Sequence, residues 1–201
     1  MIKGTSVVAK SDPSSHKKEK AKTIRWVVTI FFVTIFVSGM ISMISDEIMA
    51  KSSMVVAFLI LLAIVLLGII FDIIGVAVTS ADEKPFHSMA ARKVPGAQEA
   101  IGLLRNAERV SSICNDVVGD ICGVVSGSAS ATIAAQILQN FEFSWPQIVS
   151  LLMSALVAGL TVGGKAIGKG IAIGSCTDIV HIAGKMIYQF SCMTRVFKKK
   201  K

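Results

Sequence analysis

Four long apolar runs, separated by short polar stretches, dominate the hydrophobic pattern of this chain. A helix needs roughly 17 to 25 apolar residues to cross about 30 Å of hydrocarbon, and each run meets that requirement. The pattern therefore predicts an all-α integral membrane protein with four transmembrane helices, which together form a transmembrane domain over residues 24–174. The predicted spans are residues 24–44, 54–78, 110–135 and 147–163.

The segments outside the spans are polar or amphipathic. Residues 85–107, punctuated by Pro85 and Pro95, predict short juxtamembrane helices. Residues 175–201 alternate apolar and polar groups at helical spacing, which predicts an amphipathic cytoplasmic helix followed by a basic tail. Residues 1–23 contain many Lys and Ser and few apolar residues, and this composition predicts a disordered basic cytoplasmic tail.

The distribution of Lys and Arg predicts how the chain faces the membrane. Seven lie at residues 3–25, five at 84–109 and eight at 165–201, so that of the 21 in the chain only Lys51 remains. Because Lys and Arg in short loops stay in the cytoplasm, both termini are predicted to be cytoplasmic, in an N-in, C-in arrangement within the cytoplasmic (plasma) membrane. Basic ends beside membrane spans favour contact with anionic lipid headgroups over binding of nucleic acid.

Acidic and amide side chains inside the predicted spans are the main candidates for chemistry. Asp72 lies near the inner end of the second span, and Asn115, Asp116 and Asp120 lie in the inner half of the third. A charge at the bilayer centre costs about 2.5–3.5 kcal/mol on insertion scales, so it persists mainly beside a partner or a wet cavity. Carboxylate and amide oxygens suit Mg²⁺. The alternative is that these groups hydrogen-bond between helices or lie at the membrane interface.

Other patterns limit the remaining functional classes. The sequence contains no Ser–His–Asp order, no HExxH and no P-loop, so an enzyme is not expected, and no permanently bound cofactor is predicted. Small or polar residues recur every four positions in the third span, which favours close helix packing in lipid. These residues are Ser111, Asn115, Gly119, Gly123, Gly127 and Ala131.

A series of short motifs also runs along the sequence from Phe71 to Lys169. The series comprises Phe71, Ala77 and Ser80, then Gly96-Ala97, Leu103, Leu104, Asn106 and Arg109, then the stretch from Asn115 to Ile121, and finally the stretch from Gly164 to Lys169. In this order the motifs resemble the membrane domain of the cyclin-M / CorB–CorC family of magnesium transporters. The resemblance implies a homodimer that transports Mg²⁺, and also Co²⁺, through a cytoplasm-open acidic cavity.

The resemblance further implies that Ser80 is an outer contributor to the cavity and that Asp116 and Asp120 occupy asparagine positions of the family. The chain departs from the family motifs at Gly75 and Lys165, both of which stand where the family has glutamate. Lys165 is the cytoplasmic cation expected closest to the cavity, where its charge would oppose a dication. The CBS domain pair usual in the family is not expected after Lys169.

Two functions follow as alternatives. The first is divalent cation transport, with Mg²⁺ as the transported ion and Asp72, Asp116, Asp120, Asn115 and Ser80 as the cation-facing residues. The second is a non-transporting membrane scaffold or partner subunit with a degenerate ion site, which the residues at positions 75 and 165 favour.

Overall fold

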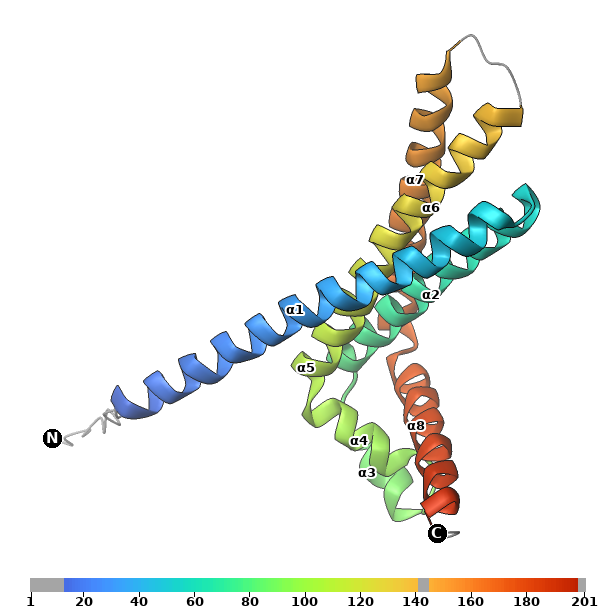
Figure 1. Ribbon diagram of the computed structural model, residues 1–201. Coiled ribbons are helices and arrows are strands. Elements are labelled where there is room, and N and C mark those ends of the chain that lie inside the picture. Colours follow the sequence, from blue (N-terminus) through green and yellow to red (C-terminus); the bar gives the residue numbers. More distant parts are fainter. Residues whose placement is uncertain (1–12, 141–144, 199–201) are drawn as a thin grey trace, which may run out of the picture. The chain divides into compact units, whose positions relative to one another are not determined.

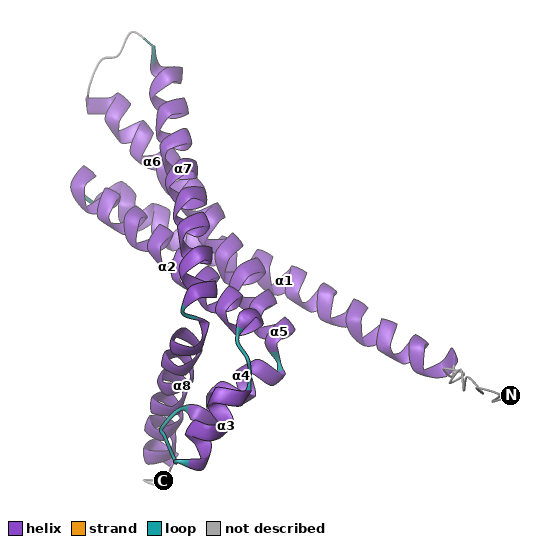
Figure 2. Ribbon diagram, turned by 180° about the vertical axis from the view of Figure 1, so that it is seen from behind, coloured by secondary structure: helices purple, strands orange, loops and turns teal. Residues whose placement is uncertain are grey.

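The computed structural model describes residues 13–140 and 145–198, with side chains described over 24–49, 51–140 and 145–193. All regular structure in these ranges is helical, as both ribbon views show (Figure 1, Figure 2). The elements are α1 (Pro13–Lys51), α2 (Met54–Ser80), α3 (Lys84–Ala91), α4 (Ala97–Arg105), α5 (Ala107–Ser112), the π-helix η1 (Ile113–Gly119), α6 (Asp120–Asn140), α7 (Pro146–Gly174) and α8 (Cys176–Lys198).

Four helical segments are long and apolar enough to cross a membrane, which confirms the predicted all-α architecture at this level. They are Ile24–Met49, Met54–Ser80, Ala107–Asn140 and Pro146–Gly174. The second has the highest mean hydropathy, 3.3. The chain divides into two compact units, residues 1–37 and 38–201. The first unit holds the N-terminal part of α1, and the second holds every other described helix.

The helices extend beyond the predicted spans. Of the tail predicted over residues 1–23, residues 1–12 lie outside the described residues. The rest of it belongs to α1, which begins at Pro13. At the other end of the second unit, α7 continues through the glycine-rich stretch to Gly174. Glycine weakens an isolated helix because it gains backbone freedom on unfolding. In α7, glycine instead allows close packing, since side chains at Gly164 and Gly168 would collide with Ile69 and Ile73 of α2.

Helices α2, α6 and α7 pack against one another in pairs and form the centre of the second unit. Buried apolar residues from these helices and from the end of α1 form one cluster: Met49, Ala57, Leu61, Val65, Ala129, Ile133 and Val157. Two side-chain hydrogen bonds attach the end of α1 to α6. The Ser128 hydroxyl donates to the carboxylate of Asp46, and the Gln136 amide donates to the carbonyl oxygen of Met49 at 2.8 Å.

A second layer of shorter helices, α3 and α4, lies beside α8 at one end of the unit (Figure 1). Its core joins Phe86, Ala100 and Val180 to the end of α2. Helices α4 and α8 approach closely at two glycines: a Cβ at Gly184 would lie 2.5 Å from the carbonyl oxygen of Gly96. Gly96 also has a φ of 86°, in the left-handed region that favours glycine. These glycines therefore permit the packing of α8.

Candidate functional site

Asp72 is the one charged residue among the buried residues of the described chain, with an exposed fraction of 5%. It lies in the last third of α2, on the side that faces α7 and the third span. Its carboxylate oxygen Oδ1 is 3.9 Å from the ammonium nitrogen of Lys165 on α7. This separation makes an ion pair and is too long for a hydrogen bond. The charge of Asp72 is thus partly balanced by Lys165, the cation that the sequence places closest to the expected cavity.

The close contact of α7 with α2 brings Lys165 to Asp72. Its neighbours Gly164 and Gly168 lie against α2, so the backbone of α7 is held near that helix. The lysine side chain also passes η1, because a Cβ at Gly119 would lie 3.4 Å from its Nζ. The side chain of Lys165 is 24% exposed, whereas that of Asp72 is 7% exposed. The carboxylate is therefore enclosed, and the ammonium reaches it from a more open position.

The third span opens with an irregular segment where it passes this carboxylate. Residues 113–119 form the π-helix η1, between α5 and α6. Such segments are rare, and as short bulges they frequently occur at functional sites because they redirect side chains. Here Asn115 is directed at α2: a Cβ at Gly75 would overlap its amide oxygen Oδ1. Gly75 thus provides the space that the Asn115 side chain fills.

Two oxygen atoms, one on α2 and one on η1, have no hydrogen-bond partner. They are Oδ2 of Asp72 and Oδ1 of Asn115, and both atoms are buried. The amide nitrogen of Asn115 donates to the Ser111 hydroxyl at 3.2 Å, which leaves its oxygen as the unpartnered end. Asp72 and Gly75 are three residues apart, so they share one side of α2 within a turn. The two unpartnered oxygens therefore lie on the same side of α2, where η1 packs against it.

The other predicted site residues lie in different surroundings. Asp116 and Asp120 are both exposed, the first in η1 and the second at the start of α6. Ser80 is exposed at the end of α2. Among the described residues, no three His, Cys, Asp or Glu side chains are grouped as a metal site. The structure thus pairs Asp72 with Lys165 and sets Asn115 against Gly75 of the same helix α2, and it leaves Asp116, Asp120 and Ser80 exposed.

A groove of small side chains opens between α6 and α7. Its volume is about 210 Å³, and its lining residues include Gly123, Gly127, Ser154 and Ala158. A Cβ at either of these glycines would meet no atom within 4 Å. The predicted stripe of small residues is therefore divided: Gly119 is buried near Lys165, whereas Gly127 and Ala131 are exposed.

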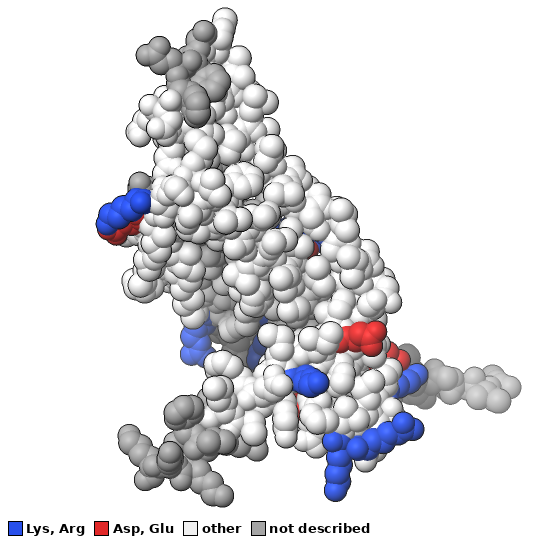
Figure 3. Space-filling view, turned by 90° about the vertical axis from the view of Figure 1, so that its right-hand side faces the viewer, with Lys and Arg blue, Asp and Glu red and all other residues white. Residues whose placement is uncertain are grey.

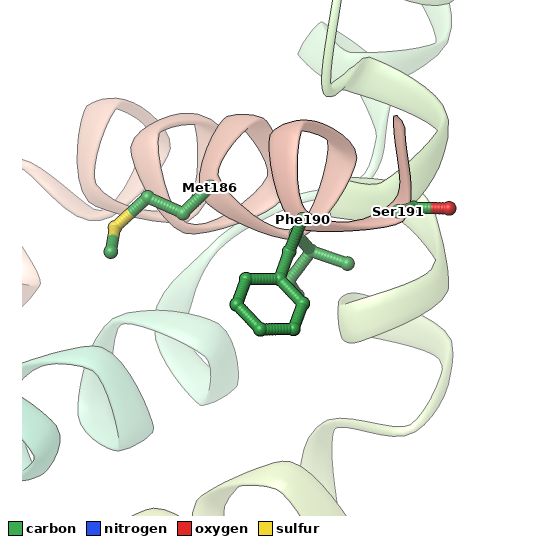
Figure 4. A pocket seen from close by; sticks show the side chains of 4 residues that line it. Met186, Phe190 and Ser191 are labelled. Atoms are coloured by element: carbon green, nitrogen blue, oxygen red, sulfur yellow. The ribbon is translucent and has the colours of Figure 1, made fainter. Parts of the chain in front are cut away.

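A second hollow lies against α8 and is largely apolar. It has a volume of about 480 Å³ and is lined by Met186, Ile187, Phe190 and Ser191. Met186 and Phe190 project from one side of the helix (Figure 4). Most of the molecular face in Figure 3 is uncharged, and charged side chains gather mainly at the end that holds α3, α4 and α8. This end therefore combines exposed apolar residues with charged ones.

Two functional features escaped the sequence pattern. A hydrophobic pattern with a regular helical period cannot predict the π-helical register of η1, although the sequence does identify Asn115 as a candidate site residue. The role of Gly75 as space for Asn115 also depends on a contact between residues distant in sequence. No family model, no curated protein and no solved structure matches this chain, so the resemblance to the cyclin-M / CorB–CorC family stays a prediction.

Proposed function

We propose that this protein transports a divalent cation, with Mg²⁺ as the leading substrate and Co²⁺ as a second, across the membrane that its helices span. One observation carries the proposal: Asp72 Oδ2 on α2 and Asn115 Oδ1, which lies against Gly75 of α2, are buried oxygens without hydrogen-bond partners. Buried polar atoms are nearly always hydrogen-bonded, and exceptions mark functional groups, ions or water. A carboxylate and an amide oxygen are ligands of the type that Mg²⁺ takes.

The surroundings of these oxygens also suit transport. Mg²⁺ gives up its water reluctantly and is commonly held through one or two protein oxygens while it keeps several waters. A site with few protein ligands is therefore adequate for passage. We assign Asp72 and Asn115 to the centre of the site. Asp116, Asp120 and Ser80 would act further out, where exposed oxygens can meet a hydrated ion.

Binding of Mg²⁺ to the full-length protein in detergent tests this assignment, measured by isothermal titration calorimetry. Asp72→Asn keeps the size of the side chain and removes its charge, and we expect it to abolish measurable binding. The matched control is Asp82→Asn, which removes an exposed carboxylate just beyond α2. Asp116→Ala and Asp120→Ala test the outer positions in the same assay. Undiminished binding in both would remove these two residues from the site.

A membrane scaffold or partner subunit is the second candidate, and the Asp72–Lys165 ion pair favours it. A lysine that neutralises the buried carboxylate can be a permanent structural partner, as ion pairs inside membranes often are. In that case the groove between α6 and α7 would receive a helix of a second copy, giving the homodimer. Growth of a magnesium-transport-deficient strain separates the candidates, because only the transporter restores growth.

The exposed side of α8 fits a lipid surface as partner. Ile182, Met186, Phe190 and Met193 are exposed apolar residues spaced at helical intervals. The chain ends in four lysines, which anionic headgroups attract. We therefore assign α8 to the cytoplasmic membrane surface, where this apolar stripe would enter the headgroup region.

A further inference from the structure

We infer that Lys165 is an internal competitor of the transported cation: its ammonium group occupies the Asp72 carboxylate at rest, and the arriving cation displaces it. This inference rests on the proposed transport function and adds a regulatory residue to the same site. Nothing in the family resemblance supplies it, because the family has glutamate at this position.

The ion pair of Asp72 with Lys165 is asymmetric in burial. The Asp72 side chain is 7% exposed and the Lys165 side chain is 24% exposed, with 3.9 Å between Oδ1 and Nζ. A buried carboxylate needs a positive partner, since an isolated charge in the bilayer is unfavourable. Lysine can provide this charge on a long, flexible stem that makes a point contact, whereas arginine would hold the carboxylate with two parallel hydrogen bonds.

The ion pair also leaves the site incomplete. Lys165 approaches Oδ1 of Asp72, and neither Oδ2 nor the amide oxygen of Asn115 has a hydrogen-bond partner. A structural partner selected only for stability would be expected to satisfy such buried acceptors, because a buried acceptor without a hydrogen bond costs free energy. The lysine therefore balances the charge of the site without saturating its ligands, as a displaceable occupant must.

The Lys165 side chain is also only partly enclosed, with 24% of it exposed. Its Nζ lies beside Gly119 of η1, where a Cβ would be 3.4 Å away. The Lys165 side chain leaves α7 at the edge of the contact between α7 and α2, since the preceding residue, Gly164, packs on Ile69 of α2. This partial exposure is what would let the Lys165 side chain withdraw from Asp72 while the helices stay in place.

The test is the Mg²⁺ affinity of full-length variants in detergent, measured with Mg²⁺ as the only added ligand. Lys165→Gln removes the competing charge at similar length, and we expect a roughly tenfold or greater rise in the association constant, the order that a partly screened unit charge near 4 Å produces. Lys165→Arg should lower the association constant, because a guanidinium binds carboxylate more firmly. Lys169→Gln, exposed one turn further along α7, is the matched control and should leave the affinity unchanged.

The outcomes separate this inference from the proposed function. Opposite shifts in Lys165→Gln and Lys165→Arg, with an unchanged Lys169→Gln, support the competitor role. If the wild-type protein binds Mg²⁺ and Lys165→Gln binds it with the same or a lower affinity, then Lys165 is not a competitor, and the transport proposal still holds. If neither the wild type nor Lys165→Gln binds Mg²⁺, then the transport proposal fails and the competitor with it. Thermal unfolding of each variant identifies those that lose affinity only through misfolding, and Lys165→Met then replaces Lys165→Gln.

Discussion

Gly75→Ala tests whether the contact between α2 and η1 has the geometry on which the candidate site depends. A methyl group at this position would overlap Oδ1 of Asn115, and it would lie 2.7 Å from Cγ and 3.1 Å from Nδ2. The whole amide would have to move, and its hydrogen bond to Ser111 would be lost. Gly75 is itself buried in the middle of the contact, so neither helix can retreat without disturbing its neighbours.

The expected magnitude follows from three terms. Overpacking costs about 1–3 kcal/mol, and the lost hydrogen bond costs about 1 kcal/mol. Alanine returns about 0.5–1 kcal/mol because it loses less backbone freedom than glycine in a helix. We therefore expect the free energy of unfolding to fall by about 1–3 kcal/mol. Gly159→Ala is the control: no atom lies within 4 Å of its Cβ, so alanine should be neutral or stabilising there.

The assay is reversible unfolding by SDS in mixed micelles, followed through the fluorescence of the native tryptophans. A second variant identifies the colliding partner. In the Gly75→Ala background, Asn115→Ala should recover about 1 kcal/mol or more, the size of coupling found between residues in direct contact. Gly75→Ala as stable as Gly159→Ala, or a lack of recovery on removing Asn115, would refute the described geometry.

Two further predictions concern other contacts of the second unit. Gly184→Ala should release α8 from α4, because its methyl group would collide with the backbone of Gly96. Limited proteolysis should then cleave α8 sooner in this variant than in the control Gly174→Ala, whose Cβ meets no atom within 4 Å. Equal cleavage rates in the two variants would contradict the described packing of α8 on α4. Gly123→Leu should disrupt a dimer on a native gel without lowering monomer stability, since no atom of the chain lies within 4 Å of that Cβ. An unchanged oligomeric state would exclude the groove between α6 and α7 as the dimer interface.

The four apolar helices could be predicted from the sequence because hydrocarbon thickness fixes both their length and their composition. The ends of the helices were less predictable. The glycines of α7 weaken a helix locally, yet α7 continues to Gly174. Two of them, Gly164 and Gly168, pack on Ile69 and Ile73 of α2, and the sequence pattern does not show these contacts. Hydropathy is a property of single segments, whereas such contacts join segments far apart in the chain.

The candidate site was predictable in part for the same reason. Charge in an apolar run identified Asp72, and the predicted cytoplasmic location of Lys165 identified this lysine as a neighbour. The sequence placed Asp116 and Asp120 with Asp72, but Asp116 lies within η1 and Asp120 directly follows it, and both side chains are exposed. A π-helix depends on packing, here on the Asn115 amide filling the space over Gly75, and a single sequence contains no direct signal for it.

In the proposed function, the buried carboxylate of Asp72 serves cation transport. The most direct measurement is uptake of Mg²⁺ into proteoliposomes that contain the purified full-length protein and an enclosed fluorescent Mg²⁺ indicator. We expect uptake by the wild type and by Asp82→Asn, and loss of uptake in Asp72→Asn at equal protein incorporation. Uptake by Asp72→Asn at the wild-type rate, or no uptake by the wild-type protein above empty liposomes, would contradict it.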